Sequence, residues 1–272
     1  MATTIITKSN VFPYYNKMCR EMASAYEVLK DSFNTDYVTD LCALRGYAGE
    51  EQKNLIREMK IGTCVVDDTT ILGEHRKELG LVSRRDNFLL DDRYIIPVHD
   101  MRNNIVALIG YYPDIKKYIT TSSPFFAKEC MFFNFRQAYD LAWKEFGGNV
   151  FVVEGIFDCL SLRAIGLPAM ATMGATVSDM KCTLLGLFNK VIAIPDDDVV
   201  GRRATNRYSK YGWKVPYNAT FLRFHGGTFT VNDIELKCKD MDNFVSWYEA
   251  DDVRSILTSF FDSHEEIEDL YI

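Results

Sequence analysis

The sequence predicts an α/β protein: a mixed α+β region, followed by a domain with a mainly parallel sheet flanked by helices. Two observations predict this fold class. Residues 14–60 show helical periodicity, and β-rich runs follow them up to residue 112. From residue 149 onward, short apolar runs alternate with helical segments, as in parallel β-α units. We therefore expect three parts, at residues 1–128, 129–250 and 251–272.

The first part is expected to begin with helices. The stretches "YYNKMCREMASAYEVLKDSF" and "GEEQKNLIREMK" place apolar residues at helical spacing. The runs "GTCVV", "RYIIPVHD" and "NNIVALIGYY" are rich in β-branched and aromatic residues, which predicts strands. A polar turn at residues 101–104 joins the last two runs into a hairpin.

The second part reads as alternating strands and helices. After the helix "RQAYDLAWKEFG", the expected strands are "NVFVVEG", "PAMAT" and "KVIAIPD". The helices that follow them are "FDCLSLRAIG", "VSDMKCTLLGLF" and "GRRATNRYSKYG". The stretch "DDVRSILTSFF" near the C-terminus has an apolar face at helical spacing, which predicts an amphipathic helix. Such a helix covers the domain's own core, or it carries a mobile acidic end that competes with DNA or binds a partner.

The composition of the chain limits the classes of protein to which it can belong. The chain has 272 residues, of which 47% are hydrophobic, and no apolar run is long enough to cross a bilayer. The N-terminus lacks the pattern of a signal peptide, so we expect a cytoplasmic protein without membrane partners, in a bacterial or phage-infected cell. Seven cysteines without a C-x-x-C pair and four scattered histidines indicate reduced thiols and no zinc. The net charge of −7 comes entirely from residues 249–272, so the body is neutral and can carry a basic face.

Acidic side chains follow two of the expected strands. Glu154 ends the run "VFVVE", and Asp158 lies one helical turn later, beyond Gly155, which we expect to permit a sharp turn. Asp196 and Asp198 follow the run "VIAIP", and residues two apart in an extended segment face the same way. Ligands of open α/β sheets bind at the carboxyl ends of the strands.

A third acidic pair, Asp240 and Asp242 in "KDMDNF", has the same spacing. Carboxylates without Cys or His partners select Mg²⁺ or Mn²⁺, and these ions serve phosphate chemistry. A solvated acidic turn is the alternative for either strand-end motif taken alone.

The two strand-end motifs together resemble the Toprim domain of bacterial-type primases, topoisomerases and some nucleases. They read E-G-x-x-D from Glu154 and D-x-D-x-x-G-x-x-A from Asp196. Upstream, "ALRGYAGEEQKNLIREMKIGTCVVD", "RYIIPVHDMRNNIVALIG" and "KKYITTSSPFFAKECMFF" are similar to successive segments of the bacterial replicative primase core of the DnaG kind. With "KDMDNFV", the resemblance covers about residues 20–250 in order.

The resemblance implies a function and a set of site residues. It implies a DNA primase, a DNA-directed RNA polymerase that makes short RNA primers on single-stranded DNA from ribonucleoside triphosphates. Glu154, Asp196 and Asp198 would be catalytic and would hold Mg²⁺ or Mn²⁺, with Asp158, Asp240 and Asp242 as further metal candidates. The candidate residues for binding nucleic acid or nucleotide are Arg45, Arg93, Lys117, Lys128 and Arg202.

Three departures from the family pattern are visible. The family's zinc ribbon is missing from the start, its helicase-binding domain is missing from the end, and Tyr111 stands where the family has a basic residue. We therefore expect a compact core of the kind a phage encodes, served by a replicative helicase and a separate zinc-binding subunit. A Toprim-type nuclease is the alternative enzyme. A degenerate core that binds single-stranded DNA as a replication accessory is the non-enzymatic alternative.

Overall fold

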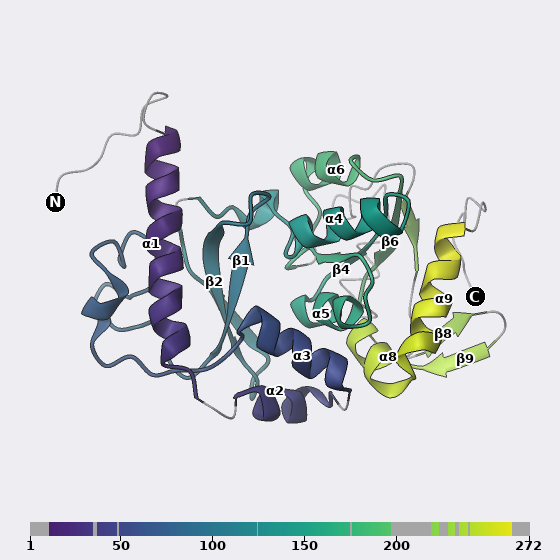
Figure 1. Cartoon of the computed structure of the whole chain (residues 1–272), viewed down its shortest axis with the longest axis horizontal. Coiled ribbons are helices and arrows are strands. Elements are labelled where there is room, and N and C mark those ends of the chain that lie inside the picture. Colours follow the sequence, from purple (N-terminus) through teal and green to yellow (C-terminus); the bar gives the residue numbers. More distant parts are fainter. Residues whose placement is uncertain are drawn as a thin grey trace. The chain divides into compact units, whose positions relative to one another are not determined.

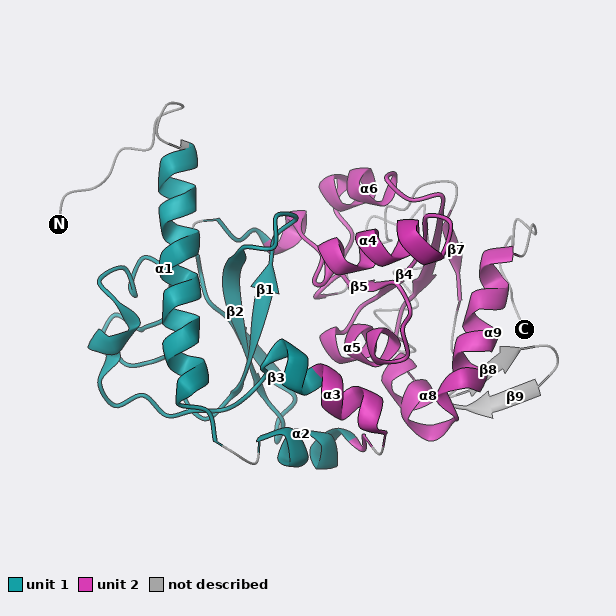
Figure 2. Ribbon diagram, in the orientation of Figure 1, with its two compact units in different colours: residues 1–45, 56–127 teal, residues 46–55, 128–272 magenta. Residues whose placement is uncertain are grey.

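The computed structural model describes residues 11–34, 37–47, 49–123, 125–174, 176–196, 219–222, 228–231, 234–238 and 240–262. The chain divides into two compact units, which are coloured separately in Figure 2. Unit 1 comprises residues 1–45 and 56–127, and unit 2 comprises residues 46–55 and 128–272. The segment 46–55, which the sequence analysis places in the N-terminal part, thus groups with unit 2.

Unit 1 begins with helices. They are α1 (Val11–Asp31), α2 (Tyr37–Arg45) and α3 (Glu50–Met59), whose last turn belongs to unit 1, and the short 3-10 helix η1 (Thr69–Leu72) follows. Helix α1 buries Met18, Met22, Ala25 and Leu29, which recur every three or four residues and so share one face. That face packs in the core of unit 1 with Ile95 and Leu108 of the sheet, so the predicted helical periodicity is confirmed.

The sheet of unit 1 is an antiparallel meander. Strands β1 (Tyr94–His99), β2 (Ile105–Tyr112) and β3 (Lys117–Thr120) are paired in the order β1-β2-β3, which confirms the predicted hairpin (Figure 1). The turn between β1 and β2 is held by Asp100, whose Oδ1 accepts the backbone N–H groups of Arg102 and Asn104, both at 2.8 Å. This is an Asx-type turn, in which the side-chain oxygen takes the place of a backbone carbonyl of a turn.

The strand predicted for "GTCVV" is wrong. Residues 62–66 contain an isolated bridge between Gly62 and Ile95 and no strand. Burial does alternate here, because Cys64 and Val66 are buried while Val65 is exposed. The backbone groups bond to loops instead of a neighbouring ladder, as where Val66 N–H donates to Asp91 Oδ1 at 3.0 Å.

Unit 2 is built on a parallel sheet, as predicted. Strands β4 (Asn149–Val153), β5 (Ala169–Ala171), β6 (Lys190–Ile194) and β7 (Ala219–Phe221) pair in the order β5-β4-β6-β7, with every neighbouring pair parallel. The predicted strand runs supply β4, β5 and β6, whereas β7 was not expected. A separate hairpin of β8 (Thr228–Val231) and β9 (Ile234–Lys237) was also missed.

Helices cover both faces of this sheet (Figure 1). On one side, α4 (Phe135–Glu145) and α6 (Asp179–Leu185) share a core with the side chains of Val150, Val152, Val191 and Ala193. The short 3-10 helix η2 (Lys128–Cys130) precedes α4. On the other side lie α5 (Ile156–Ala164), α8 (Met241–Trp247) and α9 (Ala250–Asp262). The helix predicted at residues 201–212 lies outside the described residues.

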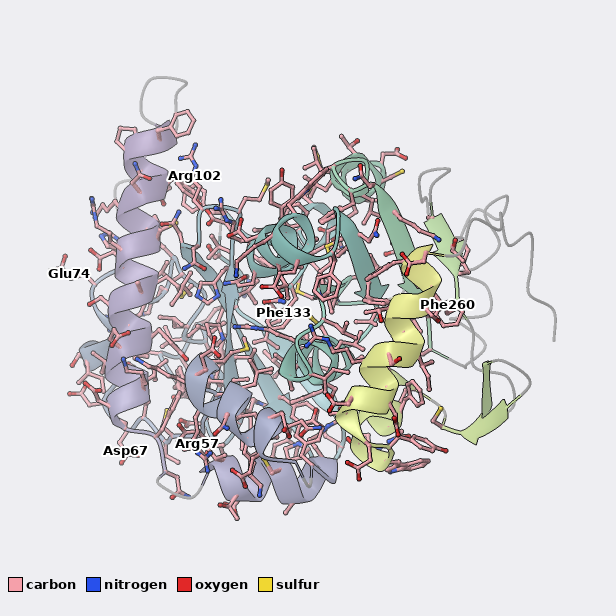
Figure 3. The ribbon with its side chains drawn as sticks, turned by 45° about the vertical axis from the view of Figure 1, so that its right-hand side comes forward. Arg57, Asp67, Glu74, Arg102, Phe133 and Phe260 are labelled. Atoms are coloured by element: carbon pink, nitrogen blue, oxygen red, sulfur yellow. The ribbon has the colours of Figure 1, made fainter. Side chains whose placement is uncertain are left out.

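Helix α9 is the predicted amphipathic helix near the C-terminus. It buries Val253 and Leu257 completely, and the ring of Phe261 lies 4.6 Å from that of Phe151 in β4. Figure 3 shows the side chains and labels Phe260 in α9. The backbone carbonyl of Phe260 accepts a hydrogen bond of 2.7 Å from the ammonium group of Lys190. Helix α9 therefore covers the core of its own unit, and the acidic stretch beyond residue 262 lies outside the described residues.

Two composition-based expectations can be checked. All seven cysteines are free thiols. In the described part of the chain, no helix is long and apolar enough to cross a membrane.

Candidate active site

Two acidic residues stand at the ends of neighbouring strands. Strands β4 and β6 are parallel partners, with Val153 opposite Ile194. Glu154 follows Val153 directly and Asp196 follows Ile194 by two residues, and both side chains are half-buried. The fold therefore brings these two predicted site residues to the same carboxyl edge of the sheet, where ligands of such sheets bind.

The absence of a side chain at Gly155 leaves room for the side chain of Asp158. The chain bends at residues 154–155 before α5 begins, as expected, but the backbone of Gly155 is extended (φ −88°, ψ 147°). Any residue can adopt this conformation, so the turn does not depend on the conformational freedom of glycine. A Cβ at residue 155 would instead overlap Oδ2 of Asp158. The missing side chain thus lets the Asp158 carboxylate lie directly against the residue after Glu154.

Asp158 and Asp242 form a buried acidic pair linked to two hydroxyl groups. Asp242 N–H donates to Asp158 Oδ1 at 2.8 Å. Asp242 Oδ1 accepts the hydroxyl of Tyr47 at 2.6 Å and that of Ser161. All four residues are buried. The contacts join the start of α5, the start of α8 and the segment 46–55 within unit 2.

Negative charge gathers around Asp158. Burial raises the pKa of its carboxyl well above the ordinary value of 3.8, and the charges of Asp196, Asp242 and Asp240 raise it further. The N–H of Asp242 opposes this shift because it stabilises the charged form. Asp240 itself caps α8, since its Oδ1 accepts the N–H of Asn243 at 2.8 Å. Ionising all of these carboxyl groups at once is therefore unfavourable, because they lie close together and Asp158 is buried.

Two predicted site residues, Asp198 and Arg202, lie outside the described residues. Within the described part, no three Asp, Glu, His or Cys side chains are grouped closely enough to hold a metal ion.

Comparisons with known proteins agree on one fold. The family model described as Toprim-like matches residues 151–245, all within unit 2. The RNA polymerase domain of the Mycobacterium tuberculosis primase DnaG has 16% identity and a TM-score of 0.70, with 89% of this chain and 82% of that one covered. A DnaG primase catalytic domain bound to single-stranded DNA has 17% identity and a TM-score of 0.68, covering 90% and 79%.

The chain has the fold of a DnaG-type primase core. The resemblance inferred from the motifs is thereby confirmed. A curated relative, the DNA primase of Synechococcus elongatus, is 24% identical over 264 residues, which is 90% of this chain. This chain spans about a third of that relative's length, and about a quarter of the length of the DNA primase of Clostridium acetobutylicum, to which it is 28% identical.

The four basic candidates that are described lie in different settings of the primase-core fold. In unit 1, Arg45 is half-buried and donates from Nη1 to Tyr111 Oη at 3.4 Å. Tyr111, which replaces a basic residue of the family, is buried and so is not a surface contact. Arg93 stacks over the ring of Tyr112, with its guanidinium carbon 5.2 Å from the ring centre.

The two lysine candidates are exposed. Lys117 lies at the start of β3, beside the partly exposed ring of Tyr118. Lys128 opens unit 2, and its Nζ lies 3.1 Å from where a Cβ on Gly174 would stand. Between the two lysines in the sequence, the ring of Phe125 lies 5.4 Å from that of Tyr14 and 5.1 Å from that of Tyr15, so Phe125 packs against the core of unit 1.

The sequence analysis missed a buried lysine in the Toprim-like domain. Lys181 of α6 is only 1% exposed, its Nζ donates to the carbonyl of Thr172 at 2.5 Å, and it lies over the ring of Phe132. Burial is the main cause that lowers its pKa to about 8. The bonded carbonyl belongs to the turn after β5, in which Met173 has a φ of +59°. The sequence around Lys181 gave no sign that its side chain would be buried and bonded to the Thr172 carbonyl.

Proposed function

We propose that this chain is the catalytic core of a DNA primase, a DNA-directed RNA polymerase that synthesises short RNA primers on single-stranded DNA by divalent-metal-dependent nucleotidyl transfer. The observation that carries the proposal is the position of Glu154 and Asp196 at the ends of neighbouring parallel strands. It is supported by a likeness to primase cores that extends over nine-tenths of the chain, unit 1 included. A nuclease would need the Toprim-like domain and not the fold of unit 1.

The donor set suits Mg²⁺ or Mn²⁺. The carboxylates at the strand ends are hard oxygen donors, and the charges that raise the pKa of Asp158 are of the kind that a divalent cation relieves. Glu154, Asp196 and Asp198 would hold the metal. When bound, the metal lowers the pKa of the attacking hydroxyl and neutralises charge on the phosphates. Because Oδ1 of Asp158 and Oδ1 of Asp242 already accept hydrogen bonds from the protein, we assign these two residues to shaping the site.

The chain's own residues have distinct tasks in the proposed reaction. The primer 3′-hydroxyl attacks the α-phosphorus of a ribonucleoside triphosphate, forming a new phosphodiester bond and releasing pyrophosphate. Glu154 and Asp196 orient the reacting groups at the sheet edge. The exposed ammonium groups of Lys117 and Lys128 attract the phosphates of template and nucleotide. One structural neighbour is a primase domain bound to single-stranded DNA, which supports the choice of template.

One assay tests the proposal. The full chain is incubated with single-stranded DNA and labelled ribonucleoside triphosphates, with Mg²⁺ or Mn²⁺, and the products are separated on a denaturing gel. A ladder of short labelled RNA is the expected result. Shortened DNA would show a nuclease instead. Retained DNA binding without either product would show an accessory protein.

A further inference from the structure

A buried network of hydroxyl groups fixes the orientation of Asp242. The hydroxyl groups of Tyr47 and Ser161 both donate to the same carboxylate oxygen, Oδ1, and the two hydroxyl oxygens lie 3.2 Å apart. The exposed fractions of Tyr47, Ser161 and Asp242 are 5%, 0% and 3%. In this dry setting the hydroxyl groups replace water as donors to the carboxylate. Two donors converging on one oxygen also fix the rotation of the group.

The network extends from Asp242 to the candidate metal centre. The Asp242 N–H donates to Asp158 Oδ1, and the other oxygen of Asp158 lies against Gly155. Gly155 is the residue that follows Glu154 at the end of β4. A chain of direct contacts therefore runs from the two hydroxyl groups to the residue beside a predicted metal ligand.

The residue types in the network indicate that it does more than fill the core of unit 2. A buried carboxylate contributes little stability compared with apolar side chains of the same volume. Here the two donors come from segments far from Asp242 in the sequence, since Tyr47 lies 195 positions and Ser161 81 positions before it. Groups that orient the carboxylates of metal sites from behind have this arrangement, and their loss weakens metal binding.

We propose that Tyr47 and Ser161 are positioning residues of the candidate metal centre. They hold Asp242, which holds Asp158 in place beside Glu154. The inference rests on one element of the proposed function, namely that Glu154 and its neighbouring strand-end carboxylates hold a divalent cation, and not on the identity of the reaction.

The test is direct binding of Mn²⁺ to the full chain, measured by electron paramagnetic resonance without nucleotide or DNA. Tyr47→Phe removes one hydroxyl and keeps the ring, and we expect it to weaken Mn²⁺ binding about 10- to 100-fold. The matched control is Tyr26→Phe in unit 1, where the buried hydroxyl donates to the Lys60 carbonyl at 2.6 Å. The control loses a buried hydroxyl bond of similar kind and should keep the wild-type affinity for Mn²⁺.

Ser161→Ala provides a second variant if Tyr47→Phe does not fold, and its expected effect is in the same direction. Variants that are less stable but bind Mn²⁺ as the wild type does would overturn the proposal, as would a wild-type chain that binds no Mn²⁺. Weakened Mn²⁺ binding in a chain that makes no primers would support the positioning role while refuting the primase proposal, so the two failures are distinguishable.

Discussion

The two units differ in what they bury. Within the described residues, the buried polar side chains of unit 1 are neutral hydroxyl groups, those of Thr69, Thr121 and Ser123. Its ion pairs lie nearer the surface, as between Arg76 and Asp86. Unit 2 instead buries charged or chargeable groups: Asp158, Asp242 and Lys181. Burying such groups is costly, and their concentration in unit 2 agrees with the proposal that places the active site there.

The largest expected effect is the loss of primer synthesis on substitution of the strand-end carboxylates in unit 2. Glu154→Gln or Asp196→Asn should reduce primer synthesis by on the order of 100-fold or more, because each removes an anionic ligand of the proposed metal site. The fold should persist, since removing one charge from a crowded acidic site relieves repulsion. Primer yield and the thermal midpoint in EDTA are the measurements.

The control for these variants is Asp251→Asn, which neutralises an exposed aspartate of α9 in the same unit. It should leave synthesis unchanged. Near wild-type synthesis by Glu154→Gln or Asp196→Asn would show that the site is misplaced.

Unit 1 should respond to loss of apolar contacts. Leu29→Ala removes a completely buried side chain of α1 and should lower the free energy of unfolding by about 2 to 5 kcal/mol. Urea denaturation measures the change. Val65→Ala, at a side chain that is 63% exposed, is the control and should change stability by no more than about 0.5 kcal/mol. Equal losses in both variants would contradict the assignment of the core.

Lys181 should give unit 2 a characteristic pH dependence. Its pKa is lowered from 10.5 to about 8 in the folded chain, so the unfolded chain binds more protons between these values. Stability should therefore rise with pH in this window, by roughly 2 to 3 kcal/mol from this group. Lys181→Met should lack the rise when unfolding is compared at pH 7 and pH 10. An identical pH dependence in both proteins would show that Lys181 is charged throughout.

Asp158 should make the stability of unit 2 fall with rising pH, the opposite of the effect expected from Lys181. Because its pKa is raised in the folded chain, its contribution to stability is fully present below pH 3.8 and is lost as the pH rises. Without metal, Asp158→Asn should therefore melt at a higher temperature than the wild type at pH 7, and the difference should shrink toward pH 4. A variant that melts lower by the same amount at both pH values would contradict this.

The smallest effects concern the exposed lysines, one in each unit. Lys117→Ala and Lys128→Ala should each weaken binding to single-stranded DNA a few-fold and reduce the salt slope by about 0.7 if each contacts one phosphate. Lys144→Ala on α4, whose side chain is 78% exposed, is the control. Fluorescence anisotropy at several salt concentrations measures the slope. An effect of one lysine only would assign the DNA contact to its unit.

Much of the fold could be predicted because local patterns determine it. The face of α1, the β1–β2 hairpin and the β-α alternation of unit 2 all follow from periodicity within a few residues. The position of Glu154 and Asp196 follows from the same rule, since parallel strands end at a common edge. The strand predicted for "GTCVV" was wrong because a run rich in β-branched residues does not by itself provide a neighbouring strand.

The supporting part of the site could not be predicted, for a different physical reason. The contacts of Tyr47 with Asp242 and of Lys181 with Thr172 depend on how distant segments pack. The role of Gly155 depends on where the Asp158 side chain lies, which backbone preference does not determine. In sequence, Tyr47 lies in the turn "LRGYAG" between two helical stretches and gives no sign that it packs in unit 2.

The insertion of residues 46–55 into unit 2 has a consequence for biosynthesis. Tyr47 and Asp242 are separated by 195 residues. A ribosome adds about 5 to 20 residues per second, so Tyr47 is made roughly 10 to 40 s before its partner. All of unit 1 has been synthesised by residue 127, and its core does not require the later chain. The segment 46–55 must wait for the last part of unit 2, which makes closure of the Asp242 network one of the final events in the maturation of the nascent chain.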